Sequence, residues 1–155
     1  MQTHTLVRGA IAGVAATIPM TLVIAAGRAA GLMRTPPPKQ IMANAEAAAG
    51  MDGARDEAFT ARWMMSHVAY GAGCGVLYGV ARPHVPGGRS NAVPDGLAFG
   101  GAIWAASYCV VMPALGVFPW PWDDDHTRTA VMIAAHGVFG VALAAASSRL
   151  DAFPS

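Results

Sequence analysis

The chain has 155 residues, of which 54% are hydrophobic and only 12% are charged. Soluble globular domains carry about 25% charged residues, so this composition indicates a protein surrounded by lipid. The formal net charge is +1, which offers no basic surface for a nucleic acid partner. The length fits a single domain that covers residues 1–155.

Four windows lack Asp, Glu, Lys and Arg for long enough to cross a bilayer, namely 9–27, 63–81, 96–118 and 129–148. A helix that rises 1.5 Å per residue needs about 20 residues to cross about 30 Å of hydrocarbon. A soluble Ala-rich bundle is the alternative, but its helices would carry a charged outer stripe that these windows lack. We therefore expect an all-α integral membrane protein with four transmembrane helices, over residues 6–31, 62–82, 93–118 and 127–149.

The segment 36–60 links the first two expected helices. It opens with three prolines, Pro36 to Pro38, which enforce an extended conformation before a helix can begin. The Ala-rich stretch 40–49 then predicts a short helix. We expect this helix to lie on the membrane surface, with Ile41 and Met42 facing lipid.

The stretch FPWPWDDDH, residues 118–126, predicts a membrane interface. Trp120 and Trp122 suit the headgroup layer, where one side of an amphipathic ring is dry and the other is wet, and Trp63 begins its helix in the same way. The triplet Asp123 to Asp125 resembles an N-cap of the last helix, whose amide end favours negative charge. A metal site on the triplet is the alternative.

Small residues recur at intervals of four on every expected helix, in GxxxG-type patterns. Residues four apart lie on one helix face. Association in lipid gains little from hydrophobic transfer, so helices adhere through the close backbone approach that small residues permit. We expect a small-residue-packed four-helix bundle in which the contacts are made by Gly9, Gly13, Gly71, Gly75, Gly79, Gly96, Gly100 and Gly140.

Two histidines, His67 and His136, head the glycine lines of the second and fourth expected helices. These helices run in the same direction, so the two imidazoles can face one another across the bundle. An ionisable residue inside a membrane is a functional-site hypothesis by default. His67 and His136 are therefore the candidate site residues.

Three interpretations of the histidine pair stay open. Neutral imidazoles can hydrogen-bond to Ser66, Ser107, Tyr108 or a backbone carbonyl and fix helix packing. They can instead be the axial ligands of a b-type haem, with the adjacent glycines making room for the porphyrin. Proton transfer or metal binding, with His126 and Asp125 nearby, is the third, although spacing fixes no third zinc ligand.

Catalytic motifs do not occur in the sequence. It contains no nucleophile motif, phosphate loop, dinucleotide fingerprint or HExxH pattern, so we expect no enzyme. Cys74 and Cys109 lack CxxC spacing and are most simply small apolar residues of their helices.

From the second helix onward, the order of features resembles the YagU-like family of bacterial inner-membrane proteins, a family of uncharacterised function. The residues that carry the resemblance are the HxxYGxxxGxxY run 67–78, the pair Tyr108 and Cys109, the PWPW segment 119–122, and His136 with Gly137. The prolines and Lys39 after the first helix are similar too. The resemblance implies a location in the bacterial cytoplasmic membrane and implies no activity.

The small-residue surfaces and short loops predict an accessory subunit that packs within a larger membrane complex or associates with itself. A haem-binding electron carrier, or the anchor of a quinone-linked oxidoreductase, is the alternative. A transporter ranks last, because only Thr17, Thr21 and Ser107 add polar groups near mid-membrane. We also expect bound lipid, and cytoplasmic termini, because the basic residues on the side of the termini lie close to the helix ends.

Overall fold

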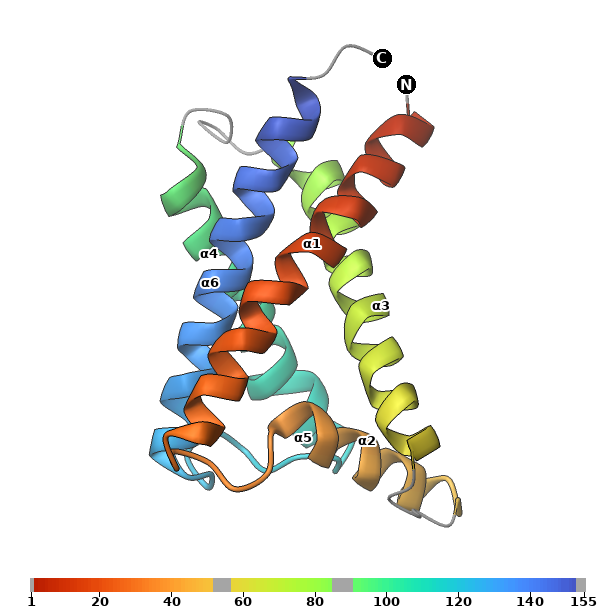
Figure 1. Cartoon of the computed structure of the whole chain (residues 1–155), viewed down its shortest axis with the longest axis vertical. Helices are drawn as coiled ribbons and strands as arrows, with labels where there is room; N and C mark the ends of the chain where they lie inside the picture. The colour runs from red at the N-terminus through yellow and green to blue at the C-terminus, as the bar shows by residue number, and fades with distance from the viewer. Residues whose placement is uncertain (1, 52–56, 85–90, 153–155) are drawn as a thin grey trace.

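The computed structural model describes residues 2–51, 57–84 and 91–152, and within these ranges it is helical and contains no strand. Both termini lie at one end of the molecule, and α2 and α5 lie at the other end (Figure 1). In chain order the elements are α1 (Gln2–Ala29), α2 (Pro37–Ala48), α3 (Glu57–Ala81), a 3₁₀ turn η1 (Arg82–His84), α4 (Ala92–Ala106), a π-helical turn η2 (Ser107–Val111), α5 (Met112–Ala114) and α6 (His126–Asp151).

Three helical segments are long and apolar enough to cross a membrane: Thr3–Ala29, Ala92–Ala114 and His126–Asp151. They correspond to the first, third and fourth of the predicted spans. The remaining prediction falls on α3, which is 25 residues long and contains Ser66, His67 and several glycines, and which is not among the helices that meet the hydropathy of a span. Three helices are therefore long and apolar enough to be the predicted spans, and a fourth span stays a prediction.

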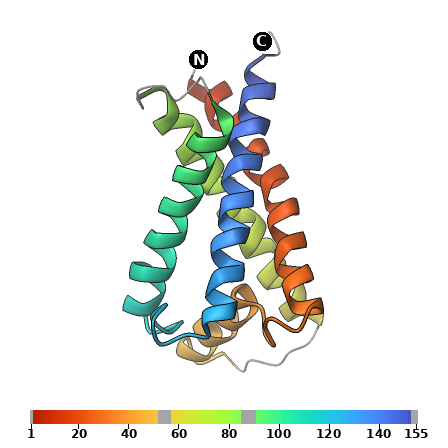
Figure 2. The same cartoon turned by 90° about the vertical axis from the view of Figure 1, so that its left-hand side faces the viewer.

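The long helices pack in a chain of neighbours rather than all around one axis. α1 packs against both α3 and α6, and α4 packs against α6 (Figures 1 and 2). α3 and α6 run in the same direction, as the sequence predicts, and α1 runs opposite to both (Figure 1). Among the described residues, no comparable packing joins α3 to α4. The space between these two helices is where the candidate site lies.

Glycines bring α1 and α3 into backbone contact. A Cβ atom on Gly9 would lie 2.6 Å from the carbonyl oxygen of Gly75, and one on Gly75 would lie 2.8 Å from the Cα atom of Gly13. A Cβ atom on Gly71 would overlap the hydroxyl of Thr17. Because most of the opposing atoms belong to the backbone, no rotamer change can make room for a larger residue.

Glycines also bring α4 and α6 into backbone contact. A Cβ atom on Gly96 would lie 2.5 Å from the carbonyl oxygen of Gly140, and one on Gly140 would lie 2.8 Å from the amide nitrogen of Gly100. Gly79 differs, since a Cβ atom there would make an ordinary contact of 3.5 Å with the carbonyl oxygen of Thr5. The structure therefore places Gly79 where α1 and α3 have begun to separate.

The third predicted helix, 93–118, is shorter than predicted and irregular. After α4, the amide of Met112 donates to the carbonyl of Ser107, which gives the wide turn η2 just before Pro113. Proline lacks an amide hydrogen, so the α-helical ladder cannot continue through it unchanged. Gly116, at φ +68°, then ends the helix, with the amide of Val117 donating to the carbonyl of Met112 over 3.1 Å.

Other helix boundaries also differ from the predicted ones, and α2 begins at Pro37, inside the proline run that was expected to be extended. α1 begins at Gln2 and ends at Ala29, short of the predicted residue 31, because Gly31 adopts φ +74° and terminates the helix. α3 begins at Glu57, inside the predicted surface segment 36–60. Residues 52–56 of that segment lie outside the described part of the chain.

The predicted short helix after α1 exists as α2, but its orientation was predicted wrongly. Ile41 and Met42 face the interior of the molecule and not its outer surface, because both line a cavity on the inner side of α2. Three hydrogen bonds fix this orientation by tying α2 to three other segments. They run from Arg62 Nε to Glu46 Oε1 over 2.7 Å, from Asn44 Nδ2 to the Val117 carbonyl over 2.9 Å, and from Arg128 Nη1 to Gln40 Oε1 over 3.0 Å.

Substituting two glycines of α3 tests the role of backbone contact. We predict that Gly75→Ala lowers the free energy of unfolding by about 1–3 kcal/mol, because its methyl group overlaps α1. Gly73→Ala is the matched control, since a Cβ atom there meets nothing within 4 Å. It is predicted to raise stability by up to about 1 kcal/mol, the helix-propensity difference. Equal stability of the two variants in detergent unfolding would contradict the packing account.

Candidate functional site

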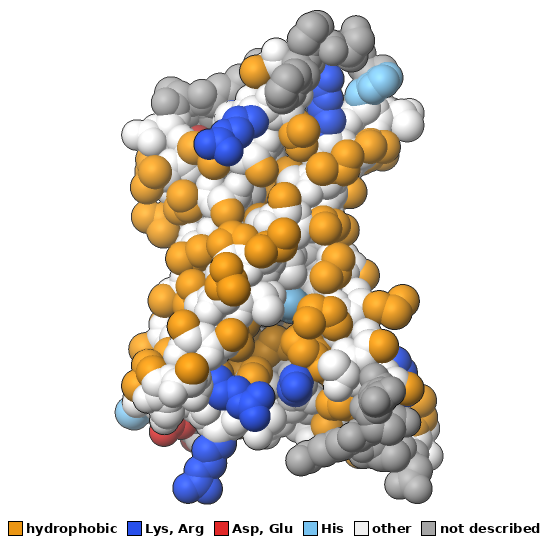
Figure 3. Space-filling model, in the orientation of Figure 1, with side chains coloured by type: hydrophobic (Ala, Val, Ile, Leu, Met, Phe, Trp, Pro, Cys, Tyr) orange, Lys and Arg blue, Asp and Glu red, His pale blue; other side chains and the backbone are white. Residues whose placement is uncertain are grey.

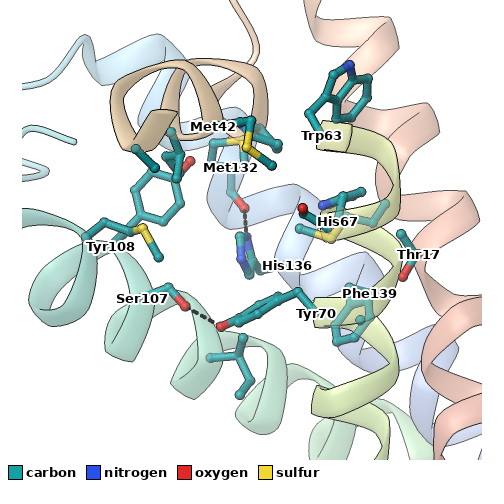
Figure 4. Close-up of a pocket in the computed structure, with 18 residues that line it drawn as sticks. Thr17, Met42, Trp63, His67, Tyr70, Ser107, Tyr108, Met132, His136 and Phe139 are labelled. Atoms are coloured by element: carbon teal, nitrogen blue, oxygen red, sulfur yellow. Dashed lines mark hydrogen bonds between the residues drawn. The ribbon is translucent and has the colours of Figure 1, made fainter. Parts of the chain in front are cut away.

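A cavity of about 270 Å³ lies between α1, α2, α3, η2 and α6. Its opening is visible as a hollow with hydrophobic surroundings and a histidine surface inside it (Figure 3). Figure 4 shows the side chains that converge on the cavity from the surrounding helices. The volume exceeds the roughly 150 Å³ of an engineered protein cavity that binds benzene, so the space admits a small molecule or part of a longer chain.

α3 contributes one continuous helix face to the cavity. Trp63, Ser66, His67 and Tyr70 line it, and their spacing of three or four residues places them on the same side of the helix. α6 contributes Met132, His136 and Phe139 at similar spacing (Figure 4). The two predicted histidines therefore lie in the wall of one cavity, on parallel helices.

His136 is buried and has a defined hydrogen bond. Its Nδ1 atom lies 2.8 Å from the carbonyl oxygen of Met132, one turn earlier in α6 (Figure 4). A carbonyl only accepts, so Nδ1 carries the proton and Nε2 is left as an acceptor. The ring also packs edge-to-face against Tyr108, at a centroid distance of 6.0 Å. This hydrogen bond matches the interpretation in which a histidine bonds to a backbone carbonyl.

His67 is held less completely than His136. Its Nε2 atom is buried and has no hydrogen-bond partner among the described residues. The ring lies 6.3 Å from that of Trp63, and the Nζ atom of Lys39 stands 5.1 Å from the Trp63 ring centroid. A buried polar atom without a partner is costly, so this position is where a ligand has the most to add.

A hydrogen bond of 2.6 Å joins the hydroxyls of Tyr70 and Ser107 across the cavity, from α3 to η2 (Figure 4). It connects the two segments that otherwise diverge. Sequence reasoning considered Ser107 as a partner of a histidine and included Tyr70 only as part of the HxxYGxxxGxxY run, not as a site residue. The available signal was spacing, because Tyr70 lies three residues after His67 and so on the same helix face.

Other helices fill the space beside the glycines that lie next to the histidines. The space beside Gly71 is filled by Thr17 of α1, and the space beside Gly140 is filled by the backbone of α4 at Gly96 and Gly100. The haem interpretation assigned these glycines the role of making room for a porphyrin. The structure gives them a different role, in helix packing.

The three tryptophans predicted at the membrane interface have different surroundings. The rings of Trp120 and Trp122 stack at a centroid distance of 5.0 Å and stay 38% and 65% exposed, whereas Trp63 lines the cavity. Asp125 caps α6 by accepting from the amide of Arg128 over 2.8 Å, as the sequence predicts, and Asp124 pairs with the Arg128 side chain.

Metal ligands do not cluster in the part of the chain that the structure covers. Within 2–51, 57–84 and 91–152, no group of three His, Cys, Asp or Glu side chains could hold a metal ion. The capping and ion-pair roles of Asp125 and Asp124 account for two members of the acidic triplet.

The sequence profile of DUF6789, a family of unknown function, matches residues 3–155. The chain belongs to this family. No curated protein and no solved structure matches the chain. The resemblance to the YagU-like family stays a prediction, since the DUF6789 match does not link the two. Membership in DUF6789 brings no activity with it.

Proposed function

We propose that this protein spans the bacterial cytoplasmic membrane four times, with both termini in the cytoplasm, and binds a lipophilic ligand in the cavity lined by His67 and His136. Three helices meet the length and hydropathy that a span requires. α3 is the fourth span. Ligand binding is supported above all by the apolar cavity between the helices, which is lined by two histidines.

α3 has the length and surface of a span despite its lower hydropathy. Its 25 residues exceed the roughly 20 that a crossing needs. Its outward side chains are apolar and well exposed, such as Met65 at 70% and Leu77 at 53%. Exposed apolar residues on a helix already packed against a membrane-spanning neighbour are most simply covered by lipid.

The cavity favours an occupant on energetic grounds. The lining is almost wholly apolar, so water inside the cavity would find few hydrogen-bond partners. Methionines and aromatic rings line the space, among them Met20, Met132 and Phe139, which suits a flexible apolar ligand. A molecule from the bilayer is the natural source.

Blocking the cavity from α2 tests this function. Ala45 lines the cavity, whereas Ala47 on the same helix is exposed. We predict that Ala45→Phe abolishes retention of the ligand because the ring occupies its space, and that Ala47→Phe retains the ligand like the wild type. Native mass spectrometry of the protein released from mild detergent, with organic extraction of the bound molecule, measures this.

Three outcomes would count against the lipophilic-ligand proposal. One is a wild-type protein that carries no extra mass, and another is equal retention by both variants. The third is a Soret absorption band that disappears when His67 and His136 are both replaced by alanine, which would assign a b-type haem instead. The free Nε2 of His136 is the observation that keeps haem as a competitor, since metal-binding histidines commonly donate Nδ1–H to a carbonyl.

A second candidate function, that of an accessory subunit, rests on a shallow groove between α4 and α6. Small side chains line it, including Gly101, Ala134, Gly137 and Ala145. A Cβ atom on Gly101 would meet nothing within 4 Å, so this glycine faces outward and is not used in packing within the chain. A transmembrane helix of another subunit, or of a second copy, fits such a surface.

Substitution at Gly101 tests the groove. We predict that Gly101→Leu dissociates the complex recovered in mild detergent, because the side chain fills the groove against a partner helix. Gly73→Leu is the control, since Gly73 also faces open space but lies on α3. Size-exclusion chromatography with light scattering measures the assembly. A wild-type protein recovered only as a lone monomer would argue against the accessory role.

A further inference from the structure

Three basic side chains near the mouth of the cavity have no ion-pair partner among the described residues. They are Arg28 at the end of α1, Arg34 in the following turn and Lys39 in α2. All three line one polar hollow beside α2. In contrast, the neighbouring cations Arg62 and Arg128 are paired with Glu46 and Asp124.

These cations lie next to the cavity rather than on a distant surface. Lys39 follows Pro38, which lines the cavity, and its Nζ atom lies 5.1 Å from the ring centroid of Trp63, which also lines it. Lys and Arg side chains stand directly below the hollow in Figure 3. The apolar cavity and the hollow that holds the three cations therefore lie next to each other at α2.

The distance along α1 from the cations to the cavity matches the length of a lipid acyl chain. Arg28 follows the cavity-lining residues Met20 and Thr17 by eight and eleven positions of α1. At 1.5 Å per residue these separations are about 12 and 16 Å, close to half of the roughly 30 Å hydrocarbon thickness. An amphiphile whose head is at Arg28 can therefore reach the level of Met20 and Thr17, which line the same cavity as His67, with an extended chain.

We infer that the ligand is an anionic phospholipid, with its phosphate against Arg28, Arg34 and Lys39 and one acyl chain in the cavity. This inference rests on the proposed function and names its ligand class. The three cations attract a net negative headgroup and disfavour one that carries its own ammonium group. An uncharged ligand such as a quinone would leave the cations without a role. The acyl chain fills the apolar part of the cavity and does not supply the missing partner of His67 Nε2.

Lipid titration followed by native mass spectrometry tests the inference. The probes are phosphatidylglycerol and phosphatidylcholine of identical acyl composition. The wild type is expected to prefer phosphatidylglycerol. Each removed cation is expected to weaken its binding about fivefold, so the triple variant R28Q/R34Q/K39Q should lose about 100-fold and the headgroup preference. Arg149→Gln, at the opposite end of α6, is the control and should leave the preference unchanged.

The Ala45→Phe variant distinguishes binding of an acyl chain in the cavity from recognition of the headgroup by the three cations. Ala45→Phe keeps all three cations and is expected to lose tight binding of both lipids, because the acyl chain has no space. A wild type that binds both lipids equally, or a triple variant that keeps the preference, overturns the phospholipid inference and leaves the cavity as the site of an uncharged ligand. Failure of every lipophilic molecule to bind overturns the proposed function as well.

Two further outcomes are decisive. Competition by inorganic phosphate without any contribution from the acyl chain assigns a free-anion site and overturns the inference.

Circular dichroism establishes whether the triple variant is folded. Arg34→Gln alone, a change at an exposed side chain, provides the single-cation comparison. An unchanged affinity in that folded single variant also overturns the proposed role of Arg34.

Discussion

The structure depends on the contact of helix backbones at glycine. Lipid chains are as apolar as the helix surfaces, so burying apolar area does little to draw one helix to another, and close packing has to supply the attraction. In α1 and α3 that packing is possible because Gly9, Gly13 and Gly75 leave the two backbones unobstructed. Among the long helices described, α3 packs substantially only against α1. Its position therefore follows from these few residues.

This constraint explains why the molecule contains a cavity. α1 is shared between α3 and α6, and α4 is held on the far side of α6, so α3 and the η2 turn cannot close against each other along their length. The hydrogen bond between Tyr70 and Ser107 spans the separation at one level, and α2 covers the space at the end opposite to the termini. The two histidines line the space that remains.

Much of this arrangement could be predicted from the sequence because it follows from local rules. Spacing of four placed the glycines on helix faces, and the direction of each helix placed His67 and His136 on parallel elements. The cap at Asp125 followed from the preference of helix amide ends for carboxylates. The predictions that failed depend on how the helices are arranged in space. An apolar face at Ile41 and Met42 predicts burial, but it does not distinguish lipid from the interior of the same chain.

The cavity itself was beyond sequence analysis for the same reason. Spacing showed that Gly71 and Gly140 accompany the histidines, yet it did not show that Thr17 and α4 occupy the space beside these glycines. It also gave no sign that Gly79 lies where α1 and α3 separate. α3 is not among the helices that meet the hydropathy of a span, and an average over a helix does not register a neighbour that packs against it.

Whether α3 crosses the membrane beside α1 is the most direct test of the account. Single cysteines replacing Ala49, before α3, and His84, after it, can be labelled with a membrane-impermeant maleimide in intact cells and in inverted vesicles, in a variant in which Cys74 and Cys109 are alanine. Both positions are exposed. The account predicts that the two cysteines react from opposite sides of the membrane. Labelling of both from the same side would contradict it.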